Sequence, residues 1–334
     1  MVITHSDVPA VKSSTYTISF QRRSQSAYIR HRKLVSSAFT RLAMTVAKDN
    51  GVEHPNDTSL TVVSSNGLHL VPQRCSKTVH FIRHGEGFHN IGYEENVDAH
   101  LTPYGWHQAA ALGKHVRSLQ PPLNIELVVV SPLMRTCETA AGVFGGAAPG
   151  SPDGELLMKR QDDSHLERSA HDAIALPADM PFVAEELVRE RMGSSPCDSR
   201  RPLHLTQEHF PGIDYSQIET DEDVQWQKVH EQINNKGEYR VGESEDATEQ
   251  RGLKFLKWLL ARPESRIAVV AHAGIIRHTL SAFAKGLPRA AASDLTQEFN
   301  NCEMRSIVLS DASVAPPSDK TRFPGGHQWE TAHL

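Results

Sequence analysis

Three short apolar stretches dominate the hydrophobic pattern of the chain, at residues 78–82, 125–130 and 266–271. Each is rich in Val, Ile, Leu or Phe, which is typical of strands buried on both faces of a parallel sheet. Apolar residues at helical spacing follow the second and third stretches or lie between them, as in Leu112, Val116 and Leu119. The alternation of buried strands with amphipathic helices predicts an α/β fold with a mostly parallel sheet.

Helix-start signals accompany these patterns. Thr102 followed by Pro103 predicts an N-cap and first helical residue, and Ser131 followed by Pro132 predicts another. A third helix is expected after Ser244. A fourth is expected after the last apolar stretch, with Ile276, Leu280 and Phe283 on its buried face, and a final strand is expected at 306–309.

Polar residues stand where the predicted strands end. Arg83 and His84 precede Gly85, and His272 follows the stretch 266–271. Ligands of open α/β sheets bind beyond the carboxyl ends of the strands, so these side chains are candidates for one crevice. Arg135 falls in the first turn of the helix after Ser131, where free backbone N–H groups and a guanidinium suit an anion. A neutral imidazole beside guanidinium groups can receive a phosphate dianion and attack its phosphorus.

Four motifs in order resemble the histidine phosphatase superfamily, the phosphoglycerate mutase-like proteins. They are the Arg83-His84-Gly85 triplet, an SPLxRxxET segment with Arg135, Glu138 and Thr139, an AVVxHxGxI segment with His272, and a segment in which Glu190 precedes Gly193 and Pro196-Cys197-Asp198. The last segment, and an FxNCExR stretch at 299–305, are similar to the plant and fungal subgroup. The resemblance implies a three-layer α/β/α sandwich with a mostly parallel central sheet.

The resemblance also implies roles for individual residues. His84 is the expected nucleophile, and Glu190 is the expected proton donor, with Glu186 as the alternative. The expected phosphate-binding groups are Arg83, Asn90, Arg135 and His272. Arg200 and Arg201 either hold a second anionic group of the substrate or form a solvated basic pair. His89 and Asn90 lie close enough to His84 in the sequence to reach the same crevice, and an ordinary polar loop is the alternative for both.

Composition narrows the function classes. A net charge of −5 over 334 residues gives no reason to expect nucleic acid as a partner. No apolar run approaches the roughly 18 residues of a membrane span. The four cysteines form no CxxC pair and the 19 histidines form no HExxH motif, so no metal or cofactor is expected. The substrate is expected to be a small phosphorylated compound, held without metal because the pocket is already cationic.

The chain is expected to divide into three parts. Residues 1–75 form an N-terminal extension, disordered or targeting, whose first 50 residues are rich in Arg and Ser and poor in acids, as in transit peptides. Residues 76–310 form the phosphatase domain, with an inserted, substrate-selecting region at about 146–240, and residues 311–334 form a loose tail. The expected location is the cytoplasm, or a mitochondrion or plastid if the extension is a transit peptide.

The resulting functional hypothesis is a metal-independent phosphatase that hydrolyses small phosphomonoesters through a phosphohistidine on His84. Two alternatives remain: a phosphoglycerate mutase-type phosphotransferase, and a non-catalytic scaffold with the same fold. The motifs specify neither which phosphoester is cleaved nor the oligomeric state.

Overall fold

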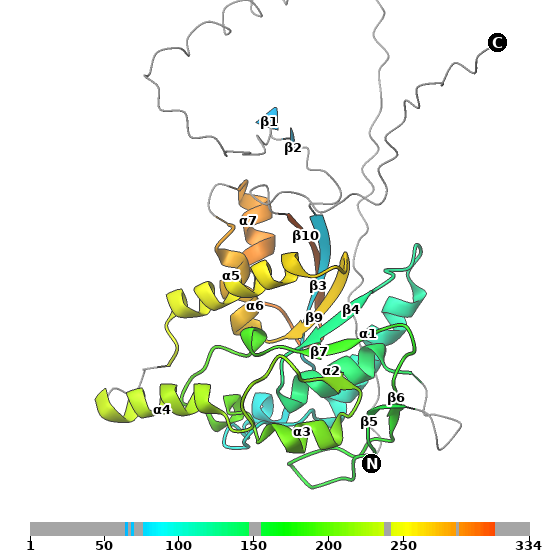
Figure 1. Ribbon diagram of the computed structural model, residues 1–334, viewed down its shortest axis with the longest axis vertical. Coiled ribbons are helices and arrows are strands. Elements are labelled where there is room, and N and C mark those ends of the chain that lie inside the picture. Colours follow the sequence, from blue (N-terminus) through cyan, green and yellow to red (C-terminus); the bar gives the residue numbers. More distant parts are fainter. Residues whose placement is uncertain are drawn as a thin grey trace, which may run out of the picture. The chain divides into compact units, whose positions relative to one another are not determined.

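The computed structural model describes residues 64–65, 68–69, 76–146, 155–236, 242–284 and 287–310 (Figure 1). The chain divides into two units, 1–57 and 58–334, and all described residues belong to the second. The predictions for the first 50 residues and for the tail at 311–334 concern residues outside the described ranges, and Cys75 also lies outside them. Within the predicted extension, β1 (Ser64–Ser65) and β2 (Leu68–His69) form a small antiparallel pair.

A six-stranded sheet forms the centre of the domain, in the order β10-β3-β9-β4-β7-β8. The strands from β3 to β8 in this order are parallel to their neighbours, and only the edge strand β10 is antiparallel. The mostly parallel α/β fold predicted from the sequence is therefore confirmed. The strand bounds are β3 Ser76–Arg83, β4 Leu127–Val130, β7 Phe182–Ala184, β8 Ile213–Asp214, β9 Arg266–Ala271 and β10 Met304–Ser310.

Alternate residues of the central strands face two separate hydrophobic cores. In β4, Leu127 and Val129 pack with α5 (Glu245–Ala261) and α6 (Ala273–Ser281), whereas Val128 and Val130 pack with α1 (Pro103–Ser118) and α2 (Met134–Phe144). This alternation is the period of two that a pleated strand imposes. The helix pairs consequently cover opposite faces of the sheet, which gives three layers (Figure 1).

The predicted helix starts are confirmed at two places and corrected at a third. The Thr102 side chain accepts the Gly105 N–H, and the Ser244 side chain accepts the Ala247 N–H. By contrast, α2 begins at Met134, later than the expected start at Pro132, because Asp98 from another segment supplies the cap by accepting the Met134 N–H at 2.7 Å. Arg135 still lies in the first turn.

The fourth predicted helix is shorter than expected. It ends at Ser281, and Phe283, predicted to lie on its buried face, is 45% exposed beyond the helix end. A further helix, α7 (Arg289–Thr296), follows and was not predicted.

The region predicted as an insertion also contributes to the central sheet, through β7 and β8. These strands are three and two residues long, too short for a hydrophobic period to reveal them. The rest of this region consists of a small β5–β6 pair, two 3-10 turns and two helices. Their bounds are β5 Leu156–Met158, β6 Ile174–Ala175, η3 Glu186–Val188, η4 Pro196–Asp198, α3 Leu203–His209 and α4 Val224–Lys236.

Two further features concern membranes and thiols. Among the described helices, none combines the length and apolar character that crossing a bilayer would require. Cys137, Cys197 and Cys302 are free thiols.

Candidate active site

Two histidines meet because their strands are neighbours. β3 and β9 are parallel and pair Arg83 with Ala271, so the next residue of each strand, His84 and His272, emerges at the same edge of the sheet. Their ring centroids are 5.1 Å apart, and both side chains are buried. The convergence that the sequence predicted for these two rings is present in the structure.

The loop after His84 approaches helix α1 very closely. A Cβ atom on Gly85 would lie 2.7 Å from the backbone oxygen of Gly105, and one on Gly105 would lie 2.1 Å from the backbone oxygen of Glu86. Only glycine fits at both positions, since real Cβ contacts are longer. The two glycines thus allow the loop to turn sharply at the strand end.

The 299–302 segment secures the end of β3. The Arg83 guanidinium donates to the Phe299 carbonyl at 2.7 Å, and the Asn301 side chain donates to the His84 carbonyl at 3.0 Å. The Cys302 N–H also lies within hydrogen-bond distance of the carbonyls of Arg83 and His84. The FxNCExR stretch therefore positions the candidate nucleophile, His84, through hydrogen bonds to the backbone carbonyls of Arg83 and His84.

Arg135 enters the same site from α2. The helix follows β4, which is the other neighbour of β9. The guanidinium is 1% exposed, donates to the Cys197 carbonyl at 2.6 Å and to Asp198 Oδ1 at 3.1 Å, and keeps Nε without a partner among the described residues. The ion pair between Arg135 and Asp198 is therefore largely buried and is not a surface salt bridge.

The imidazoles of the site are held neutral. Burial, and then the charge of Arg135, lower the pKa of His84 and of His272 well below 6.5. His89 lies 5.3 Å from His84 between ring centroids, and burial followed by the charges of Arg135 and Arg83 lowers its pKa to about 2. Arg135 lowers the pKa of all three rings, and Arg83 lowers the pKa of His84 and His89. The positive charge of the site therefore resides on guanidinium groups and not on imidazoles.

A hydrogen bond fixes which nitrogen of His84 is free. Its Nδ1 lies 2.6 Å from the Gly85 carbonyl oxygen, which can only accept a hydrogen bond. Nδ1 therefore carries the proton, and Nε2 of the neutral ring keeps its lone pair. His272 is oriented by Ser131, whose Oγ lies 2.9 Å from Nε2, and its buried Nδ1 has no partner in the described part of the chain.

Two carboxyl groups approach this cluster. Glu190 accepts the N–H groups of Gly274 and Ile275 at 3.2 and 3.1 Å, so it lies at the start of α6, directly after His272. Asp198, paired with Arg135, has its pKa raised to about 6, because the effect of burial exceeds that of the guanidinium. Glu190 is close enough to influence the charges of the site, since it acts on the pKa values of both Arg83 and Asp198.

The structure separates Glu186 and Arg200 from a direct role at the histidines. Glu186 binds Arg189 at 3.0 Å and Arg200 at 2.9 Å. The guanidinium of Arg200 also donates to the carbonyls of Arg201, Thr220, Asp221 and Glu222. Its donors are thus engaged by the protein itself, which leaves it unsuited to hold a substrate anion.

Arg201 and Asn90 take different positions. Arg201 lies 3.3 Å from Asp98 and faces another pocket, lined also by His100 and His209. Asn90 is exposed, and its side-chain oxygen accepts the Gly87 N–H at 3.0 Å, so it caps the short 3-10 turn η2 (Phe88–Ile91) at the rim of the site.

Comparison with known proteins gives the family. The family model of the histidine phosphatase superfamily (branch 1) matches residues 79–150 and 207–315. The chain belongs to the histidine phosphatase superfamily. A phosphoglycerate mutase-like protein of Arabidopsis thaliana is 37% identical over 275 residues, covering 79% of this chain and 96% of the relative. Phosphoglycerate mutase-like protein 1 of the same plant is 37% identical over 269 residues, covering 78% of this chain and 90% of the relative.

Solved structures similar to this chain include two phosphatases. The alpha-ribazole phosphatase of Shigella flexneri has 18% identity and a TM-score of 0.39, with 72% of this chain and 100% of that chain covered. A mycobacterial glucosyl-3-phosphoglycerate phosphatase in complex with VO3 has 17% identity and a TM-score of 0.37, with coverage of 69% and 90%.

Sequence reasoning gave three groups of this site no role at the histidines. His89 was expected to be within reach of the crevice but was assigned no role there, and its ring lies beside His84. Asp198 was noticed only as part of a motif, and its pairing with Arg135 spans 63 positions. Ser131 was expected to cap a helix, but it holds His272. The sequence feature that accompanies this position of His89 is Gly87. A side chain there would collide with the ring, because a Cβ atom on Gly87 would lie 2.6 Å from His89 Nδ1.

Proposed function

We propose that this histidine phosphatase hydrolyses small phosphomonoesters through a phosphohistidine on His84. The observation that carries the proposal is the state of that ring, which is neutral, protonated on Nδ1 and free at Nε2 beside two arginines. A free imidazole nitrogen is the form that attacks phosphorus. Guanidinium groups match the oxygens of a phosphoryl group, which gather negative charge in the transition state.

The first step transfers the phosphoryl group to the enzyme. Nε2 of His84 forms a bond to phosphorus as the bond between phosphorus and the ester oxygen breaks. Arg83, Arg135 and His272 stabilise the phosphoryl oxygens, with Asn90 as a further neutral donor from the rim. Glu190 gives its proton to the leaving alkoxide, which departs as an alcohol.

The second step regenerates the enzyme. Water attacks the phosphohistidine, Glu190 takes the proton of that water, and the bond between Nε2 and phosphorus breaks to release inorganic phosphate. Proton transfer of this kind contributes about 10²–10⁴ in rate. Asp198 is the rival for the donor role, because its carboxyl has a pKa of about 6 and can hold a proton near neutrality.

The test combines labelling with leaving-group dependence. His84→Ala is expected to abolish turnover and the acid-labile phosphorus label; full turnover in this variant would exclude His84 as the nucleophile. Glu190→Gln is expected to reduce kcat/KM for an alkyl phosphate about 10²–10⁴-fold, but much less for p-nitrophenyl phosphate, whose leaving group needs no proton.

Two further variants complete the comparison. If Asp198→Asn shows this selective loss and Glu190→Gln does not, the donor is Asp198; the corresponding result for Glu186→Gln would assign Glu186. Rates of hydrolysis and of phosphoglycerate isomerisation are measured side by side. Isomerisation faster than hydrolysis would refute the phosphatase proposal in favour of a mutase.

A further inference from the structure

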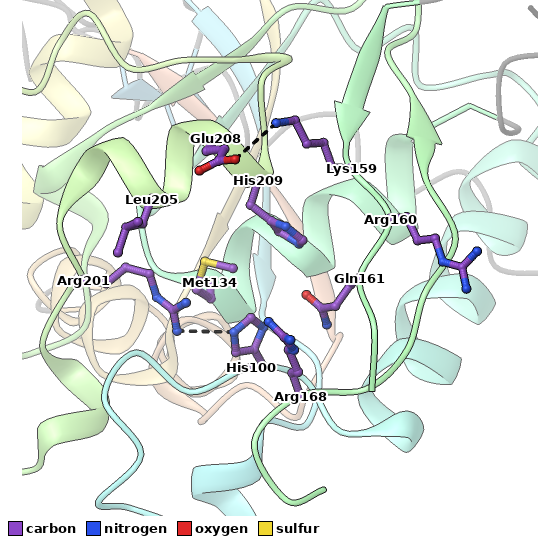
Figure 2. Close-up of a pocket in the computed structure, with 10 residues that line it drawn as sticks. All are labelled: His100, Met134, Lys159, Arg160, Gln161, Arg168, Arg201, Leu205, Glu208 and His209. Carbon is purple, nitrogen blue, oxygen red and sulfur yellow. Dashed lines mark hydrogen bonds and ion pairs between the residues drawn. The ribbon is translucent and has the colours of Figure 1, made fainter. Parts of the chain in front are cut away.

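A second pocket lies apart from the histidines, between the 159–168 segment and helix α3 (Figure 2). Its volume is about 340 Å³, at the small end of the range for small-molecule sites. Met134 contributes to its lining, whereas the next residue, Arg135, faces the histidines. Successive helical residues point about 100° apart, so α2 separates the two sites.

The electrostatic surroundings of the two sites are also different. The charges that act on His209 in this second pocket come from Glu138, His100, Arg201 and Arg168. Those that act on His84 come from Arg135, His89 and Arg83. The groups that act most strongly on these two histidines thus come from different parts of the domain.

The lining of the second pocket is strongly cationic. Lys159, Arg160, Arg168 and Arg201 contribute four positive charges and Glu208 the one carboxylate of the lining, but Arg201 is paired with the buried Asp98 at 3.3 Å. The carboxylate of Glu208 is 72% exposed and lies 3.7 Å from Lys159, so water screens it. Arg160 reaches only the exposed Asp162, and the Arg168 side chain has no ion pair among the described residues. The positive charges of Lys159, Arg160 and Arg168 therefore remain available for a ligand.

Two polar atoms of the lining lack a partner in the described part of the chain. They are Oε1 of Gln161, a residue 3% exposed, and Nε2 of His209. Gln161 Nε2 donates to the Ser169 carbonyl at 2.7 Å, which fixes the amide and leaves Oε1 as an acceptor. Figure 2 shows Gln161 and His209 facing the interior of the pocket together with His100. A hydroxyl group on a ligand would supply the missing donor, because buried polar groups normally have a partner.

We propose that this pocket, defined by Lys159, Arg160, Arg168, Arg201, Gln161 and His209, binds a small organic polyanion that carries a hydroxyl group. The cationic side chains neutralise its anionic groups, and Gln161 Oε1 accepts from its hydroxyl. The ligand is a separate molecule from the phosphoester at the histidines.

Citrate is a suitable probe, since it carries three carboxylates and one hydroxyl group, and tricarballylate is the same molecule without the hydroxyl. Isothermal titration of the full chain is expected to show one citrate site. Arg160→Glu/Arg168→Glu is expected to weaken citrate binding at least tenfold, because two attractive charges become repulsive. Tricarballylate is expected to bind at least threefold more weakly than citrate. Lys159→Gln/Arg168→Gln serves as a milder second variant if the first one fails to fold.

Two control variants locate the effect. Arg289→Glu reverses one exposed charge on α7, which is half the charge change of the double variant, and Arg83→Gln alters the histidine site. Both are expected to leave the citrate affinity within twofold of the unaltered protein. The proposal is overturned by unchanged binding in the pocket variants, by an equal loss in Arg289→Glu, by a loss confined to Arg83→Gln, or by no citrate binding at millimolar concentration. Equal affinities for citrate and tricarballylate would refute the role given to Gln161.

Discussion

Replacing Arg189 with methionine tests how the carboxyl groups of the site are held in place. Arg189 is 0% exposed and donates twice to Asp223, at 2.7 and 2.6 Å. It also donates to Glu186 at 3.0 Å and to the Asp198 carbonyl at 2.8 Å. Since Arg189 immediately precedes Glu190 and binds Asp198, its loss affects the segments that carry both candidate proton donors.

The expected cost follows from what remains after the substitution. Burial raises the pKa of Asp223, but the hydrogen bonds and charge of Arg189 outweigh it, so the net pKa is lowered. Without Arg189, this carboxylate is buried and lacks its guanidinium partner. Breaking one side of a buried ion pair costs about 3–5 kcal/mol. For a domain of this size, 1 kcal/mol corresponds to about 2–4 °C in Tm, so Arg189→Met is expected to melt about 6–20 °C lower.

Thermal unfolding followed by circular dichroism measures this difference. Arg160→Met is the matched control, because Arg160 pairs with Asp162 where the two side chains are 74% and 79% exposed. Exposed pairs contribute about 0–1 kcal/mol, so its Tm is expected to fall by at most about 4 °C. Adding Asp223→Asn to Arg189→Met removes the stranded charge and is expected to recover part of the loss. If Arg189→Met melts within 3 °C of the unaltered protein, the network does not hold these segments.

Two further predictions concern the histidine pocket and the packing of the helices. Because burial and Arg135 lower the pKa of His84 well below 6.5, the ring stays neutral as the pH falls through that value. We therefore expect kcat/KM for p-nitrophenyl phosphate not to show the roughly tenfold loss between pH 7.5 and 5.5 that an unperturbed histidine would cause; a loss centred on pH 6.5 would contradict this. Gly252→Ala would place a Cβ atom 2.0 Å from Thr279 Oγ1, where α5 meets α6. Overpacking of this kind costs about 1–3 kcal/mol, so Tm is expected to fall by about 2–12 °C, whereas Gly193→Ala, whose nearest neighbour is 3.9 Å away, should melt unchanged.

The hydrophobic pattern was sufficient to predict the half of the site that contains the two histidines and Arg135. His84 and His272 could be assigned to strand ends because the apolar stretches before them are continuous, and Arg135 could be assigned to a first helical turn. The order of the strands in the sheet was beyond this reasoning, since β9 lies between β3 and β4 although it comes last of the three in the chain. Neighbouring positions in a sheet depend on packing over long sequence separations, which a local period does not contain.

The half of the site that contains Glu190 and Asp198 was predicted less well, because its sequence shows no hydrophobic period typical of a helix or a strand. The residues from 185 to 201 form two short 3-10 turns joined by irregular backbone. Here the charged residues looked alike in the sequence, so Glu186 remained an alternative to Glu190, and Arg200 a candidate for substrate binding. Only the partners distinguish them: Glu186 and Arg200 bind each other at 2.9 Å, while Glu190 binds the start of α6.

These two halves are stabilised by different forces, and this has a functional consequence. The histidines emerge from strands packed in two hydrophobic cores, whereas Glu190 and Asp198 belong to a segment held largely by the buried ion pairs of Arg189, Arg200 and Arg135. A substitution in the ion-pair network can therefore displace the candidate proton donors while the sheet keeps His84 and His272 together. Loss of activity toward poor leaving groups, with phosphohistidine formation from p-nitrophenyl phosphate preserved, is the pattern that such a division implies for Arg189→Met.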